Sequence, residues 1–211
     1  MKLPAWLERL QLICLVLFFL SCCIILTFNF TPIYYYFVYH YHLGAKVDLS
    51  NHQLITQYHQ LIAYLNFPWI TDLKLKFKMS TEGLIHFQDV KKLVVINYLC
   101  LLISSWPAIK KLRQMQRLDS WWQLYLPSCY LLTAAAIILA FAVLDFSDFF
   151  IAFHQLLFRN QDWVFDPQTD PIIKVLPESF FAAMFGWFAI LFFGGLLSCF
   201  IITRNKLLKD K

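Results

Sequence analysis

The segment DFSDFFIAFHQLLFRNQDWVFDPQTDPIIKVLPESFF, residues 145–181, lies between two long apolar runs of the chain. Both of its ends are therefore expected at a membrane surface. Its one histidine, His154, stands among phenylalanines and leucines, where an ionisable side chain is costly unless it has a partner or a task. We expect the rest of the chain to hold this segment at the bilayer face and to bring a second histidine, His86, towards it.

The composition indicates an integral membrane protein. Of the 211 residues, 60% are hydrophobic and 15% are charged, whereas a soluble domain carries about 25% charged residues. The net charge of +5 comes from basic residues clustered at the ends of apolar runs, a pattern of membrane orientation that argues against nucleic acid binding. All six cysteines lie within apolar runs, without histidines at metal-ligand spacing, so we expect buried thiols and no metal site.

The apolar runs predict the fold class, which is an α-helical integral membrane protein with four transmembrane helices and a small α+β extracytoplasmic region. Each run approaches the length of about 20 residues that is needed to cross the hydrocarbon core. The predicted segments are an N-terminus at 1–9, spans at 10–30, 93–109, 124–144 and 180–203, extracytoplasmic segments at 31–92 and 145–179, a basic loop at 110–123 and a tail at 204–211.

The basic residues set the expected orientation. The two terminal segments and the 110–123 loop hold ten Lys/Arg and three acidic residues, while the two extracytoplasmic segments hold eight Lys/Arg and ten acidic residues. The positive-inside rule therefore places both termini in the cytoplasm. His86 and His154 are then expected on the outer face, each within a few residues of a membrane boundary.

The α+β expectation comes from two patterns in the 31–92 segment. Ser50 and Gln53 fit a capping box, and apolar residues follow at helical spacing, which predicts an amphipathic helix over 51–65. Apolar and polar residues alternate over 72–79, which predicts a half-exposed strand, with 84–87 as its hairpin partner.

Candidate chemistry is confined to the predicted outer face. The chain has no glycine-rich phosphate loop, nucleophile elbow or zinc-protease motif, and intramembrane charge is nearly absent, which argues against a transporter. Asp89 either orients His86 or caps a helix, and Arg159 either holds an anion or pairs with an acidic residue. Each histidine taken alone fits a structural role, but two histidines on one face, His86 and His154, strengthen the case for acid–base chemistry.

Three motifs carry a resemblance to a known family. They are HFQDVKKL at 86–93, FHQLLFRNQDWVFDP at 153–167 and LPESFF at 176–181. With four apolar spans, this pattern resembles the lipoprotein intramolecular transacylases, a family of four-span membrane proteins of Gram-positive bacteria. The resemblance covers nearly the whole chain.

The resemblance implies a reaction within one substrate molecule in the plasma membrane. The substrate is a diacylated lipoprotein, whose N-terminal cysteine bears a diacylglyceryl thioether and a free α-amine. The sn-2 acyl chain moves to that amine and gives the lyso-form N-acyl lipoprotein. Since the acyl donor is part of the substrate, no external donor or cofactor is expected, and membrane lipid is the one other expected partner.

The family motifs suggest roles for individual residues. We expect His86 and His154 to act as general base and general acid around the ester. Tyr41, Asp89 and Arg159 are secondary candidates for contacts to the substrate or oxyanion, or for orienting the histidines.

Two alternatives stay open at the level of the sequence. A covalent acyl-enzyme would use a hydroxyl nucleophile, and Ser147 and Ser179 lie near the motifs. A membrane accessory or assembly protein without enzymatic activity would bind a partner through the 31–92 segment, and it would tolerate the loss of both histidines.

Overall fold

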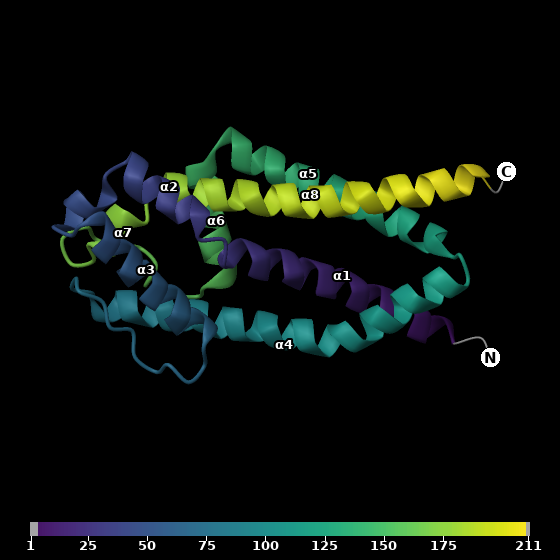
Figure 1. The fold of residues 1–211 in the computed structure, drawn as a ribbon, viewed down its shortest axis with the longest axis horizontal. Helices are drawn as coiled ribbons and strands as arrows, with labels where there is room; N and C mark the ends of the chain where they lie inside the picture. Colours follow the sequence, from purple (N-terminus) through teal and green to yellow (C-terminus); the bar gives the residue numbers. More distant parts are fainter. Residues whose placement is uncertain (1–3, 210–211) are drawn as a thin grey trace. The chain divides into compact units, whose positions relative to one another are not determined.

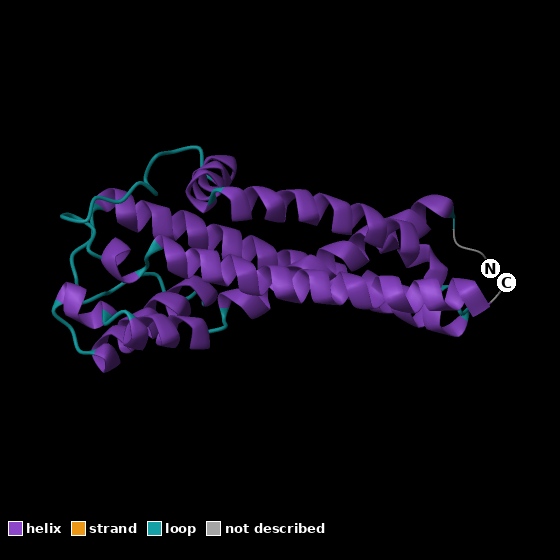
Figure 2. Ribbon diagram, turned by 90° about the horizontal axis from the view of Figure 1, so that it is seen from above, coloured by secondary structure: helices purple, strands orange, loops and turns teal. Residues whose placement is uncertain are grey.

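The computed structural model describes residues 4–209, with side chains for residues 4–205, so the predicted terminal segments 1–9 and 204–211 lie partly outside it. Within these residues every regular element is a helix (Figures 1 and 2). The α-helices are α1 Ala5–Phe28, α2 Pro32–His40, α3 Asn51–Asn66, α4 Thr81–Arg117, α5 Tyr125–Leu144, α6 Phe146–Leu157, α7 Ile172–Val175 and α8 Glu178–Lys209, and the short 3-10 helices are η1 Leu43–Val47 and η2 Trp121–Leu124.

Four helical stretches of the described chain are long and apolar enough to cross a membrane. Each contains one of the four predicted spans. In the most apolar window of each stretch, only 11–17% of the residues are buried within the chain, as is expected of side chains that face lipid. The stretches are Ala5–His40, Thr81–Arg117, Trp121–Leu144 and Glu178–Asn205.

The chain forms two compact units. The first comprises residues 4–27, 97–145 and 186–209. Its α1 and α8 pack closely at Gly195, where an added Cβ would lie 2.5 Å from the ring of Phe19 and would displace it. The sequence also offers Gly186 and Gly194 for close packing, but no atom lies within 4 Å of a Cβ at either.

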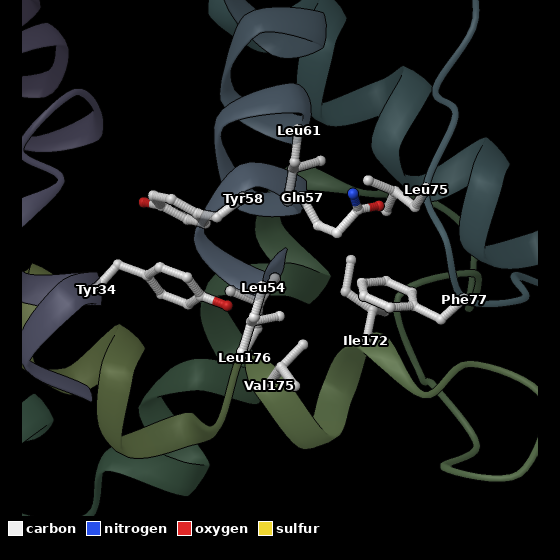
Figure 3. Close-up of a pocket in the computed structure, with 10 residues that line it drawn as sticks. All are labelled: Tyr34, Leu54, Gln57, Tyr58, Leu61, Leu75, Phe77, Ile172, Val175 and Leu176. Atoms are coloured by element: carbon white, nitrogen blue, oxygen red, sulfur yellow. The ribbon is translucent and has the colours of Figure 1, made fainter. Parts of the chain in front are cut away.

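The second unit comprises residues 28–96 and 146–185, and its core lies among α2, α3 and α7 (Figure 1). Tyr34 of α2 stacks on Tyr58 of α3 with ring centroids 3.8 Å apart, and Phe180 of α8 meets the Tyr34 ring edge-on at 5.4 Å. Figure 3 shows the two tyrosine rings one above the other beside a cavity of about 10 Å³. This volume holds about one water molecule, so the cavity is a packing defect of the core.

The amphipathic helix predicted over 51–65 is present as α3. Its N-terminus has both hydrogen bonds of the capping box. The backbone N–H of Gln53 donates to Ser50 Oγ at 3.2 Å, and the backbone N–H of Ser50 donates to Gln53 Oε1 at 3.0 Å. Leu54, Leu61 and Leu65 lie on its buried face. The spacing of apolar residues therefore predicted this element correctly.

The prediction of a β-hairpin is wrong, and with it the α+β description of this region. Residues 72–79 form no strand and include a bend at residues 76 and 77, and the predicted partner 84–87 belongs to α4. The predicted alternation of burial is present, with Leu73, Leu75, Phe77 and Met79 packed against the core and Lys74, Lys76 and Lys78 exposed. A side chain takes the place of a strand partner here, since the backbone N–H of Lys76 donates to Gln57 Oε1 at 2.6 Å. Figure 3 shows the side-chain amide of Gln57 pointing towards Leu75.

The capping box gives a test with two separate readouts. Ser50→Ala removes the acceptor of the Gln53 amide, which costs about 1 kcal/mol of helix stability. Hydrogen exchange at that amide is therefore expected to accelerate about fivefold. Gln53→Ala is the matched control, because it removes the acceptor of the Ser50 amide instead. Unchanged exchange at both amides would contradict the reciprocal cap.

Candidate active site

His86 and His154 lie close together in the second unit, although 68 positions separate them in the sequence. His86 stands in the second turn of α4, and His154 stands near the end of α6. Their ring centroids are 5.9 Å apart and their planes are inclined by 37°. One ester group can therefore lie within reach of both imidazoles.

Aromatic rings surround the pair. Phe158 and Phe165 meet His86 edge-on, with centroid distances of 4.9 and 5.5 Å. Phe150 and Trp163 lie 4.1 and 5.0 Å from the ring of His154. Rings of low polarity thus surround two titratable groups, an environment in which electrostatic interactions are strong.

The hydrogen bonds of the two imidazoles differ. His154 Nδ1 lies 2.7 Å from the backbone oxygen of Phe150. A carbonyl only accepts, so Nδ1 donates and the neutral ring keeps its lone pair at Nε2. His86 Nδ1 is buried and has no hydrogen-bond partner among the described residues. A buried polar nitrogen without a hydrogen-bond partner destabilises the folded protein. A ligand group that forms a hydrogen bond to this nitrogen would therefore bind more tightly.

Burial sets the charge state of the pair. Desolvation lowers the pKa of His154 below the ordinary histidine value, while its hydrogen bond to Phe150 acts in the opposite direction. His86 is only 7% exposed, and a charged imidazole is costly among phenyl rings. Both rings are therefore held neutral near pH 7, ready to accept a proton at one nitrogen.

Asp89 does not hydrogen-bond to His86. Its Oδ1 pairs with Lys92 at 2.8 Å, and its Oδ2 accepts a hydrogen bond of 3.0 Å from Asn160. The carboxylate thus ties α4 to the loop that carries Phe158 and Trp163. It contributes to the site by holding this aromatic wall in place.

Tyr41 and Arg159 lie outside the pair. Tyr41 is 48% exposed, and its described ring contacts are to Phe37 and His40. Arg159 is exposed beside the buried Phe158 and forms no ion pair in the described part of the chain. Neither side chain has a described contact with the ring of His86 or His154 within residues 4–205.

Asp170 joins the two motifs, and sequence reasoning missed it. Its carboxylate is 3% exposed. Oδ1 accepts the amide hydrogen of Ser80 at 2.8 Å, and Oδ2 accepts from the hydroxyl of Thr169 at 2.9 Å. Because Ser80 directly precedes α4, this carboxylate fixes the start of the His86 helix to the loop that follows His154. The Asp-Pro signal predicts a turn here, but no local pattern predicts a bond across 90 positions.

Gly83 completes this junction. Its amide donates to Ser80 Oγ at 2.9 Å, and a Cβ at this position would lie 2.5 Å from Asp170 Oδ1. Only a glycine lets the first turn of α4 approach the buried carboxylate so closely.

Comparisons with known proteins identify a matching family and similar solved structures. The family model described as "Lipoprotein intramolecular transacylase Lit" matches residues 9–181. Among solved structures, the membrane integral lipoprotein intramolecular transacylase Lit from Bacillus cereus is similar, with a TM-score of 0.87 and 25% identity over 97% of this chain and 96% of the other.

Two further structures of the Bacillus cereus protein, with one histidine replaced by arginine or by alanine, give TM-scores of 0.77 and 0.78. Each is 25% identical, and the matches cover 97% of this chain and 92% or 94% of theirs. No curated protein matches the chain.

The pKa of His154 can be measured directly. Because burial penalises the imidazolium, its titration midpoint in ¹⁵N-histidine spectra of the protein in micelles is expected below the ordinary value of about 6.5. The stability that the neutral ring contributes is then complete above that ordinary value and is lost as the pH falls through the folded pKa. His154→Asn identifies the signals, and a midpoint at or above the ordinary value would contradict the burial argument.

The junction at Asp170 predicts a non-additive pair of substitutions. Gly83→Ala drives a methyl group into the carboxylate and is expected to destabilise the protein by about 1–3 kcal/mol. Asp170→Ala leaves the Ser80 amide without its acceptor and costs about as much. In the double variant the clash is absent, so the combined loss should be smaller than the sum.

Thermal unfolding in detergent measures this cycle. Gly186→Ala is the control, since nothing lies within 4 Å of the added Cβ, and it should not lower the unfolding temperature. Strict additivity of Gly83→Ala and Asp170→Ala would show that the contact does not constrain the helix.

Proposed function

Because this chain belongs to the lipoprotein intramolecular transacylase family, whose model matches residues 9–181, we propose that it moves the sn-2 acyl chain of a lipoprotein's diacylglyceryl-cysteine to the α-amine of that cysteine. The product is the lyso-form N-acyl lipoprotein. The chain is a multi-pass membrane protein and an acyltransferase, and the proposal concerns which bond is broken and which groups break it.

The reaction is an ester aminolysis that balances within one substrate. The amine nitrogen attacks the ester carbonyl carbon and forms the amide bond, while the bond from that carbon to the glycerol oxygen breaks. One proton leaves the nitrogen and one proton reaches the glycerol oxygen. No external donor or cofactor is required, and the short distance between amine and ester within the substrate supplies much of the rate.

The juxtaposition of His86 and His154 is the observation that supports this chemistry. One neutral imidazole takes the proton from the attacking amine, and this proton reaches the leaving glycerol oxygen either directly or through the other imidazole, which can instead donate a hydrogen bond to the tetrahedral oxyanion. The lone pair at His154 Nε2 suits a base. The unpartnered Nδ1 of His86 suits a contact to the reacting group.

Three further residues have supporting roles in this proposal. Asp89 is a positioning residue, which acts through its bond to Asn160. Arg159 and Tyr41 are exposed and contact the lipoprotein near the site. The distribution of basic residues supports cytoplasmic termini and an active site on the outer face of the membrane, where the lipoprotein substrate is displayed.

Mass spectrometry of a lipoprotein's N-terminal peptide tests the function. In cells that make only the diacylglyceryl form, expression of this protein should give a lyso-glyceryl, N-acyl peptide of unchanged total mass. Fragment ions place the acyl chain on the amine. An unchanged spectrum with the protein present in the membrane would favour the accessory-protein alternative.

Histidine variants test the mechanism. His86→Ala and His154→Asn are each expected to lower the transfer rate by about 100-fold or more, the usual contribution of a general acid or base. His52→Ala is the control, because His52 is exposed on α3 and outside the pair. Full activity in both single variants, with normal unfolding temperatures, would refute the assignment of the pair.

A further inference from the structure

An open apolar groove of about 480 Å³ lies in the same unit as the histidine pair. It arises where α1 ends at Phe28 and the chain bends before Pro32 begins α2. Among its lining residues only a tyrosine has a polar side-chain atom. The lining consists of Phe30, Pro32, Ile33, Tyr36, Phe37 and Ala183.

We propose that this groove binds an acyl chain of the diacylglyceryl substrate, an inference that rests on the proposed function. Its volume falls within the range of about 300–1,000 Å³ that is typical of small-molecule sites. Its lining comes from the helical stretches Ala5–His40 and Glu178–Asn205, which are apolar enough to enter the bilayer. Apart from the Tyr36 hydroxyl, the lining of this groove offers only hydrocarbon contacts, so an alkyl chain is the matching ligand.

A continuous row of rings connects the groove to the histidine pair. Phe37 in the groove wall lies 5.8 Å from Phe180, which lies 5.3 Å from Phe181. Phe181 lies 5.4 Å from Phe150, and Phe150 lies 4.1 Å from His154. Phe37 and Phe180 are buried within this row, whereas Phe181 and Phe150 are partly exposed, so the row joins the groove to the pair through packed apolar side chains. This continuity distinguishes the groove from a surface that only solvates bulk lipid.

Ala183 is the position at which the groove can be filled. It is the one groove residue on α8, one turn after Phe180, and its methyl group is the smallest side chain of the lining. Phenylalanine at this position would occupy part of the space proposed for the chain. Tyr36, which is 57% exposed, lines the groove from α2.

Photolabelling locates the chain. The full-length protein in nanodiscs is incubated with a diacylated cysteine lipopeptide that carries a diazirine near the end of each acyl chain. A phosphatidylglycerol with the same chains, at the same mole fraction, is the bulk-lipid probe. The lipopeptide should label the groove residues several-fold more than the phospholipid does. Equal labelling of the groove by both probes would overturn the proposal.

Chain-length dependence gives a second readout. Ala183→Phe should slow transfer of a hexadecanoyl chain by at least about tenfold, the effect of losing the burial of roughly two methylene groups. Transfer of a hexanoyl chain should change little. Ala136→Phe, at an exposed alanine of α5, is the matched control and should leave both rates unchanged. An equal loss for both chain lengths would overturn the groove as a chain site.

The two experiments separate this inference from the function on which it rests. If the wild-type protein transfers the acyl chain but the lipopeptide labels residues outside the groove, the groove proposal is wrong and the transacylase stands. If the groove is labelled selectively but no chain is transferred, even in the wild type, the proposed reaction is wrong and lipoprotein binding stands.

Discussion

The buried carboxylate of Asp170 is the constraint on which the active arrangement depends. Through the Ser80 amide it fixes the first turn of α4, which carries His86, to the loop that follows α6, which carries His154. A carboxylate that is 3% exposed is costly unless its oxygens are bonded. Its contacts to Ser80, Gly83 and Thr169 therefore hold the helix start at one position and orientation, which the approach of the two imidazoles requires.

The four apolar runs follow from the sequence, because hydropathy is a local property that a single chain reveals. The helix over 51–65 follows for the same reason, since its cap and its period are local. The prediction of a strand over 72–79 was wrong, although the predicted alternation of buried and exposed residues was correct. The alternation of apolar and polar residues shows that one face is buried, but a strand also needs a hydrogen-bonded partner. The predicted partner, 84–87, is part of α4.

The contacts within the site could not be predicted in the same way. Asp89 was expected to orient His86 or to cap a helix, and it instead bonds to Lys92 and to Asn160, a residue 71 positions away. Asp170 carried only a turn signal, although it makes the most consequential long-range bond of the site. Such pairings depend on how loops fold over a core, and no periodicity in the sequence encodes them.

The engagement of both Asp89 oxygens has a consequence for charge during the reaction. In a Ser-His-Asp triad, a buried carboxylate next to the imidazole stabilises the imidazolium that forms. Here both Asp89 oxygens are bonded to other groups, and His154 Nδ1 meets a neutral carbonyl. An imidazolium among these rings would be short-lived, which favours passing the proton on as soon as it arrives. Since amine and ester become amide and alcohol, a proton relay between two neutral rings returns the site to its starting state without exchange with solvent.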